Sequence, residues 1–176
     1  MLCRRVLEDV SRTLPEFQHI DASRILMVAG EARRSSRATV KAFGKKDDPA
    51  IVIGGRRALY SITLRPKFFR TSTAEERVAT LLHELLHISP AFDGTLDESH
   101  RHDALGKNGL SPLVAPLLER YLDAGDPQLL MQLGYDGEVI ARQWLERPTG
   151  DASRKRYTEK QLFVGPLRMI TRRRLH

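Results

Sequence analysis

The chain has 176 residues, of which 41% are hydrophobic and 29% are charged, a composition typical of one folded domain in water. No apolar run approaches the roughly 20 residues that cross a bilayer, so we expect no membrane partner. The first residues lack the apolar core of a signal peptide, and the single cysteine, Cys3, excludes an internal disulfide. We therefore expect a cytoplasmic protein.

The net charge of +7 is unevenly distributed along the chain. Residues 152–176 contain eight Lys or Arg residues and one Glu, so this segment carries the whole net charge. We predict a domain over residues 1–150 and a basic C-terminal segment over residues 151–176, divided at the turn-like Pro148-Thr149-Gly150-Asp151. A basic segment favours non-specific nucleic-acid binding. The alternative is a hairpin packed on the domain with its charges merely solvated.

The first part of the chain alternates between helix and strand signals. Apolar residues recur every four positions from Leu2 to Leu14, which predicts a helix that Pro15 ends. Short apolar runs predict three strands, at Ile25–Ala29, Ala38–Phe43 and Ile51–Ile53.

The next segment has the period of a half-buried strand. Tyr60, Ile62 and Leu64 alternate with polar residues, and Pro66 closes the run. Because proline is tolerated at sheet edges and not in central strands, we predict an edge strand here.

A capped helix follows and carries the pentad His83-Glu84-Leu85-Leu86-His87. Thr73 and Glu76 have the spacing of a capping box, and an apolar stripe predicts that the helix is buried. Positions i and i+4 lie on one helix face, so both imidazoles can bind one Zn²⁺ ion. Glu84 lies about 100° around the helix, beside the metal, where it can accept a proton from water.

The remaining elements are predicted from periodicity and turn signals. We expect a helix from Ser111 to near Gly125. Two further helices are predicted over residues 128–133 and 137–147, and two short strands over residues 161–164 and 167–170.

A catalytic zinc site usually has a third protein ligand. Asp93 has the spacing of the H-x-x-G-x-x-H pattern, but Pro90 replaces the glycine that turns the chain there. Asp97 and Glu98 are minor candidates. His100 and His102 remain, because four of the six histidines lie between positions 83 and 102.

The stretch from Thr73 to Asp103 resembles the phage-type metallopeptidases, which are similar to the SprT-like and minigluzincin group of zincins. The resemblance implies an α+β fold, a compact zincin-like domain whose small mixed sheet packs an edge strand on the HExxH helix. It implies a zinc metalloendopeptidase with His83 and His87 as ligands and Glu84 as general base. It also implies a third histidine ligand, for which we favour His100, with His102 as the substitute.

By analogy with such peptidases, the strand at Tyr60, Ile62 and Leu64 is expected to bind a peptide or protein substrate. The alternative function is a nucleic-acid-associated zinc-binding module without peptidase activity. Structural zinc sites usually have four ligands and are rich in cysteine, and this chain has one cysteine. The composition therefore favours the peptidase.

Overall fold

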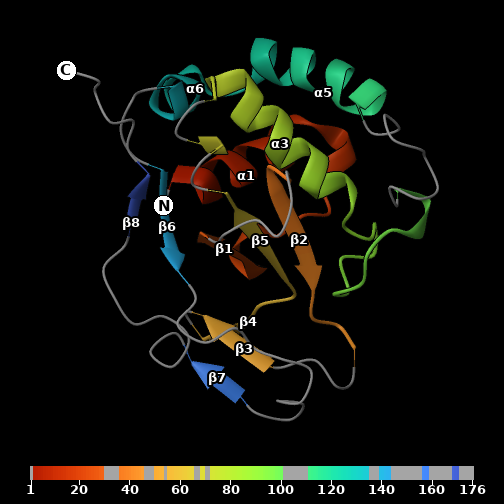
Figure 1. Cartoon of the computed structure of the whole chain (residues 1–176). Helices are drawn as coiled ribbons and strands as arrows, with labels where there is room; N and C mark the ends of the chain where they lie inside the picture. Colours follow the sequence, from red (N-terminus) through yellow and green to blue (C-terminus); the bar gives the residue numbers. More distant parts are fainter. Residues whose placement is uncertain are drawn as a thin grey trace.

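The computed structural model describes residues 2–29, 36–45, 50–53, 55–65, 68–69, 72–100, 111–134, 139–143, 156–158 and 168–170. Figure 1 shows the helices gathered on one side of the molecule and a small sheet, formed by β3, β4 and β7, at the opposite end. The fold is α+β, as predicted, with a small mixed sheet and helices packed against it.

The main sheet has five strands in the order β2-β5-β1-β6-β8. The central pairs β5–β1 and β1–β6 are parallel, whereas β2 runs antiparallel to β5 and β8 antiparallel to β6. The strand bounds are Ile25–Ala29 (β1), Ala38–Ala42 (β2), Tyr60–Leu64 (β5), Val139–Gln143 (β6) and Arg168–Ile170 (β8). The second sheet contains Ala50–Ile53 (β3), Arg56–Arg57 (β4) and Arg156–Thr158 (β7).

Helices cover one face of the main sheet and enclose the larger core. The α-helices are Leu2–Thr13 (α1), Ala74–Leu86 (α3), Ser111–Ala124 (α5) and Pro127–Gly134 (α6), with short 3₁₀ turns at Pro15–Phe17, Ala22–Arg24 and Glu98–His100. Apolar stripes of α1 and α3 pack in one cluster with the inward side chains of β1, β2 and β5. A smaller cluster of Leu26, Val28, Phe43, Ile51 and Ala58 lies apart from this core. The helices predicted from Leu2 to Leu14, from Ser111 to near Gly125 and over residues 128–133 are confirmed.

The prediction that Tyr60–Leu64 is an edge strand is wrong. β5 is bonded to β1 on one side and to β2 on the other. Tyr60, Ile62 and Leu64 have 0% of their surface exposed. They are core residues, so they do not offer the surface that a bound peptide would contact.

The helix predicted over residues 137–147 is also wrong in its described part. Val139–Gln143 forms β6, which pairs with β1 and with β8. Residues 144–147 lie outside the described part of the chain. A short apolar run fits a helix or a buried strand equally well, and pairing with β1 decides in favour of the strand.

Both described strands of the C-terminal segment pair with residues of the first 150. β7 joins β3, and β8 joins β6. The predicted strand over residues 161–164 lies outside the described residues, whereas Arg168–Ile170 falls within the second predicted strand. The domain boundary at residue 150 stays a prediction.

Among the residues that the structure describes, no helix has both the length and the apolar character needed to cross a bilayer.

Candidate metal centre

Helix α3 positions the pentad because its start and its buried face are both fixed. Thr73 accepts a hydrogen bond from the Glu76 backbone N–H, and the Glu76 side chain accepts one from the Thr73 N–H. This reciprocal pair is the predicted capping box, which is therefore confirmed. Val78, Leu81, Leu82 and Leu85 are buried in the core, which sets the rotation of the helix about its axis.

The two histidines of the pentad converge on one point. The Nε2 atoms of His83 and His87 lie 3.4 Å apart, and the rings are inclined at 78° to each other. Two nitrogens each about 2.05 Å from one tetrahedral ion would lie about 3.3 Å apart. The observed separation of the donor atoms therefore fits a zinc ion between them.

Glu84 lies beside the histidines with its carboxyl group withdrawn from water. Only 5% of its surface is exposed, and burial raises its pKa to about 7. The backbone N–H of Val40 donates to this carboxyl group and Arg65 attracts it, and both effects oppose the rise in pKa. A carboxyl group so placed is suited to accept and release a proton near neutral pH.

The contact with Val40 places Glu84 at the free edge of the sheet. The Phe43 N–H donates to the Leu59 carbonyl, and the Arg65 N–H donates to the Arg37 carbonyl. Hydrogen-bonded pairs alternate along an antiparallel ladder, so the intervening even-numbered residues of β2 direct their backbone groups away from β5. Among the described strands β2 is therefore the edge strand beside α3.

The sequence analysis did not predict that β2, and not the strand Tyr60–Leu64, forms the free edge beside α3. A signal was present, because Ala38, Val40 and Ala42 alternate with Thr39 and Lys41. The short, partly polar run resembles many ordinary strands, and only its place in the sheet order gives it a free edge beside Glu84.

The loop after α3 is held by a glycine contact and a buried tyrosine. Gly94 has a φ of +89° and donates its N–H to the Tyr60 hydroxyl at 2.9 Å, while that hydroxyl donates to the Thr95 carbonyl at 3.0 Å. The Gly44 N–H donates to the Gly94 carbonyl at 2.8 Å. Asp93 accepts two hydrogen bonds from Thr95, so it shapes this turn. Tyr60 thus anchors the loop from inside the core.

Gly94→Ala should destabilise the fold, because a Cβ there would lie 2.7 Å from the Gly44 Cα and the φ of +89° is unfavourable for alanine. The backbone strain alone costs about 1–3 kcal/mol. Gly55→Ala is the matched control, since its φ is +77° and a Cβ would meet nothing within 4 Å. Urea unfolding should give a larger decrease in unfolding free energy for Gly94→Ala. Equal decreases would contradict the close packing of the two glycines.

Downstream of this loop, Asp97 and His100 form a pair. The Nδ1 atom of His100 lies 2.9 Å from Asp97 Oδ2, and Asp97 Oδ1 accepts from the Ser99 N–H at 2.9 Å. Hydrogen bonds from Ser99 lower the pKa of Asp97, so its carboxylate stays ionised. Glu98 is exposed, and His102 lies outside the described residues.

The described residues bring together the first two predicted ligands but not a third. No group of three His, Cys, Asp or Glu side chains in this part of the chain is arranged to hold a metal ion. The His83–His87 pair and the Asp97–His100 pair are separate clusters joined through the chain, since the Asp97 N–H donates to the His87 carbonyl at 2.9 Å. The identity of the third ligand stays a prediction.

An HExxH helix on a small mixed sheet, with converging imidazoles and a buried glutamate, defines a metallopeptidase-like class of protein. A family model described as "Putative phage metallopeptidase" matches residues 3–109, more than half of the chain. The chain therefore belongs to this family, as the sequence resemblance predicted. Searches of curated proteins and of solved structures found no match. The family is described as one of metallopeptidases. Peptidases are hydrolases, and the description implies a metal ion.

Proposed function

We propose that the protein is a zinc-dependent endopeptidase. The observation that carries the proposal is the 3.4 Å separation of the His83 and His87 Nε2 atoms, which matches two ligands of one tetrahedral zinc. Both rings project from a helix whose cap and buried face fix its position. A zinc ion supplies a Lewis acid that lowers the pKa of water towards 7 and polarises a carbonyl.

Glu84 is the general base in this proposal. Its carboxyl group lies one residue from a ligand, is shielded from solvent, and is oriented by the Val40 N–H. It would take a proton from the attacking water and pass that proton to the departing amine. The low exposure of Glu84 limits competing exchange with bulk water.

The peptide would add to the free edge of β2 and not to β5. The outward backbone groups of Ala38 and Ala42 can pair with an extended chain in the manner of an added strand, whereas the Val40 N–H is taken by Glu84. Because Glu84 is hydrogen-bonded to Val40, a peptide added to this edge would pass beside the proposed base.

His100 is our proposed third ligand, with His102 as the alternative. Metal-bound histidines commonly donate their second ring N–H to a carboxylate, which fixes the tautomer and the ring orientation. The Asp97 carboxylate at 2.9 Å from His100 Nδ1 meets this description and leaves Nε2 available for a metal. Asp97 then acts as a positioning residue for the ligand.

Alanine substitutions of His100 and His102 test which of the two histidines is the third zinc ligand. His100→Ala should abolish stoichiometric zinc binding in protein prepared without chelator, while His102→Ala should retain it, as measured by elemental analysis. The reverse result would transfer the ligand role to His102. Zinc absent from the unsubstituted protein would overturn the proposed function itself.

Asp97→Asn should weaken zinc binding by about 10–100-fold, the usual effect of removing such a carboxylate partner. Competition with a chromophoric chelator measures the change. Asp93→Asn is the matched control, because Asp93 is an exposed carboxylate of the same loop that bonds Thr95 and not His100. Equal affinities in the two variants would remove the positioning role from Asp97.

We also propose that residues 152–176 bind nucleic acid without sequence specificity, since they carry all seven net charges. Truncation would remove β7 and β8, so charge neutralisation is the cleaner test. Replacing Arg172, Arg173 and Arg174 by glutamine should reduce the slope of log affinity against log salt by about 0.9 for each phosphate that is no longer neutralised. The control replaces the exposed Arg5, Arg56 and Arg57. Equal slopes in both triple variants would contradict the proposal.

The single cysteine, which is buried, agrees with a reducing compartment, and we propose a cytoplasmic location.

A further inference from the structure

Basic side chains lie along β2, the strand to which a peptide would add in the proposed function. In Figure 1, β2 lies on the outer side of β5 and beside α3. Residues 36–45 and 60–65, which contain these two strands, include four basic residues and no acidic one. Three of the four form what we call the basic edge: Arg37 before β2, Lys41 within it, and Arg65 directly after β5.

Strand geometry places charge of the basic edge on one face of the sheet. Ala38 and Val40 turn their side chains into the core beneath the helices, so Thr39 and Lys41 project on the opposite face. Arg65 reaches this face, because its Nη2 atom donates to Thr39 Oγ1 at 2.9 Å. A strand added to β2 would place every second side chain on the same face, next to Thr39 and Lys41.

The two cations of β2 and its flank are positioned by aromatic rings and not neutralised by carboxylates. The Cζ atom of Arg37 lies 5.1 Å from the ring centroid of Phe68, and Lys41 Nζ lies 5.6 Å from that of Phe43. In the described part of the chain neither cation forms an ion pair with an acidic side chain. A ring face orients a cation but carries no net charge, so both positive charges can still attract an acidic partner.

The acidic residues that adjoin β2 lie on its core side or past its end. Glu84 contacts the Val40 backbone from the core side and is buried. The loop of Asp93 approaches Gly44, so we leave the adjacent Lys45 out of the basic edge.

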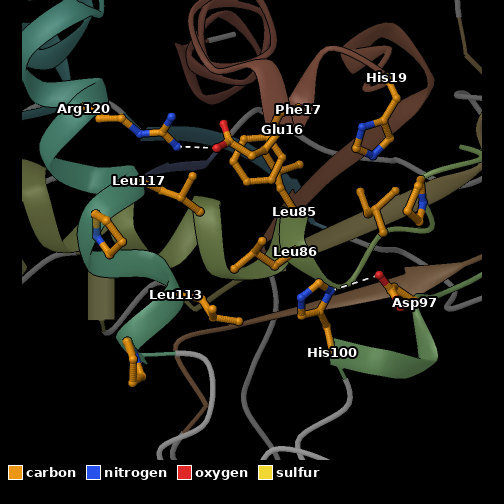
Figure 2. Close-up of a pocket in the computed structure, with 14 residues that line it drawn as sticks. Glu16, Phe17, His19, Leu85, Leu86, Asp97, His100, Leu113, Leu117 and Arg120 are labelled. Atoms are coloured by element: carbon orange, nitrogen blue, oxygen red, sulfur yellow. Dashed lines mark hydrogen bonds and ion pairs between the residues drawn. The ribbon is translucent and has the colours of Figure 1, made fainter.

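The cavity of about 380 Å³ between α3 and α5 is not a comparable source of charge. Figure 2 shows charged side chains of its lining in pairs, Arg120 with Glu16 and His100 with Asp97. The two histidines and the glutamate of the pentad are absent from its described lining. A preference for charged substrates is therefore expected to arise at β2 and not at this cavity.

We propose that the basic edge selects substrates with acidic side chains at alternate positions of the segment that pairs with β2. The inference rests on the proposed function and adds a substrate class to it. Peptide residues opposite Arg37, Thr39 and Lys41 are spaced two apart. Acidic side chains at these positions would meet Arg37, Lys41 and, beside Thr39, the guanidinium group of Arg65.

The backbone of β2 favours a peptide over nucleic acid, the other common polyanion. The outward N–H and C=O groups of Ala38 and Ala42 can pair with the backbone of an extended peptide. Nucleic acid has no backbone N–H groups with which to continue a sheet. Charge and backbone pairing therefore act together only for an acidic peptide.

Peptide binding tests this proposal without cleavage. The protein is full-length, zinc-loaded Glu84→Gln, in which we expect bound peptides to stay intact. Three fluorescent peptides with uncharged ends carry three Glu at alternate positions, three Lys at alternate positions, or three consecutive Glu, with threonine elsewhere. The consecutive isomer can place at most two carboxylates on one strand face.

Anisotropy at low salt should show that the alternating Glu peptide binds about 10-fold more tightly than the Lys peptide, because each exposed ion pair contributes little and three act together. It should also bind severalfold more tightly than the consecutive isomer. Both differences should shrink at high salt, which screens exposed charges. Equal binding of the three peptides would overturn the proposal.

Arg37→Glu should lower the preference for the Glu over the Lys peptide severalfold, and Lys41→Gln should lower it less. Arg5→Glu is the matched control, because Arg5 is an exposed arginine of α1 near Gln132 and the substitution changes the net charge equally. The control should keep the preference. Equal losses in Arg37→Glu and Arg5→Glu would assign the preference to net charge and overturn the proposal. So would single-stranded DNA that binds through Arg37 when the Glu peptide does not.

These results are distinguishable from a failure of the proposed function. Preferential binding of the alternating Glu peptide, without hydrolysis of any peptide by the unsubstituted protein, would contradict the endopeptidase and support the basic edge as a peptide-binding site. Hydrolysis of peptides without any preference for acidic side chains would support the endopeptidase and overturn the role of the basic edge.

Discussion

Glu84→Gln should bind zinc like the unsubstituted protein and lose peptide hydrolysis by about 10²–10⁴-fold, the usual contribution of a general base. An amide oxygen can still accept the hydrogen bond from the Val40 N–H, so the side chain should keep its place at the edge of β2. It cannot accept a proton from water. The values of kcat and kcat/KM, together with elemental zinc analysis, measure the two effects separately.

Glu75→Gln is the control for this loss. Glu75 is an exposed glutamate in the first turn of the same helix, so the substitution makes the same change of charge away from the histidines. It should leave hydrolysis unchanged. A Glu84→Gln variant that retained hydrolysis within a factor of about 3 of the control would exclude Glu84 as the base.

The part of the site on α3 could be predicted because its causes are local in sequence. The Thr73–Glu76 capping box fixes where the helix begins, and the spacing of the apolar residues fixes which face is buried. Once both are known, the positions of His83 and His87 follow from helix geometry. The imidazole pair at 3.4 Å is the outcome of these local rules.

The sheet edge could not be predicted in the same way, because an edge is a property of strand order. Alternation from Tyr60 to Leu64 indicated one buried face, yet Ser61 is also buried and both strand sides are paired. Polar residues at alternate positions can face a second layer as readily as solvent. The contact of Val40 with Glu84 depends on the place of β2 outside β5.

The Asp97–His100 pair could be predicted from the sequence only in part. Its spacing of three residues is local, and the cluster of histidines drew attention to it in the sequence. The carboxylate was considered only as a possible ligand, whereas in the structure it contacts Nδ1 of His100. A short 3₁₀ turn at Glu98–His100 brings the two side chains together, and such turns leave little periodic signal.

His83→Ala should abolish the stabilisation of the fold by zinc. A ligand that binds only the folded chain stabilises it by about 2.7 kcal/mol at 100 times its dissociation constant. Removing one of two converging imidazoles leaves a site with too few donors, so the variant should gain almost none of this free energy. Urea unfolding with and without added zinc measures the difference.

His19→Ala is the control, because His19 lies outside the pentad, in the segment after the 3₁₀ turn at Pro15–Phe17. It should keep the full zinc-dependent increase in unfolding free energy even if its own packing change lowers the baseline. Comparing each variant with itself, with and without metal, removes such packing effects from the result. If His83→Ala gained as much from zinc as His19→Ala does, the ion would be bound elsewhere, and the 3.4 Å pair would be only a contact between two rings.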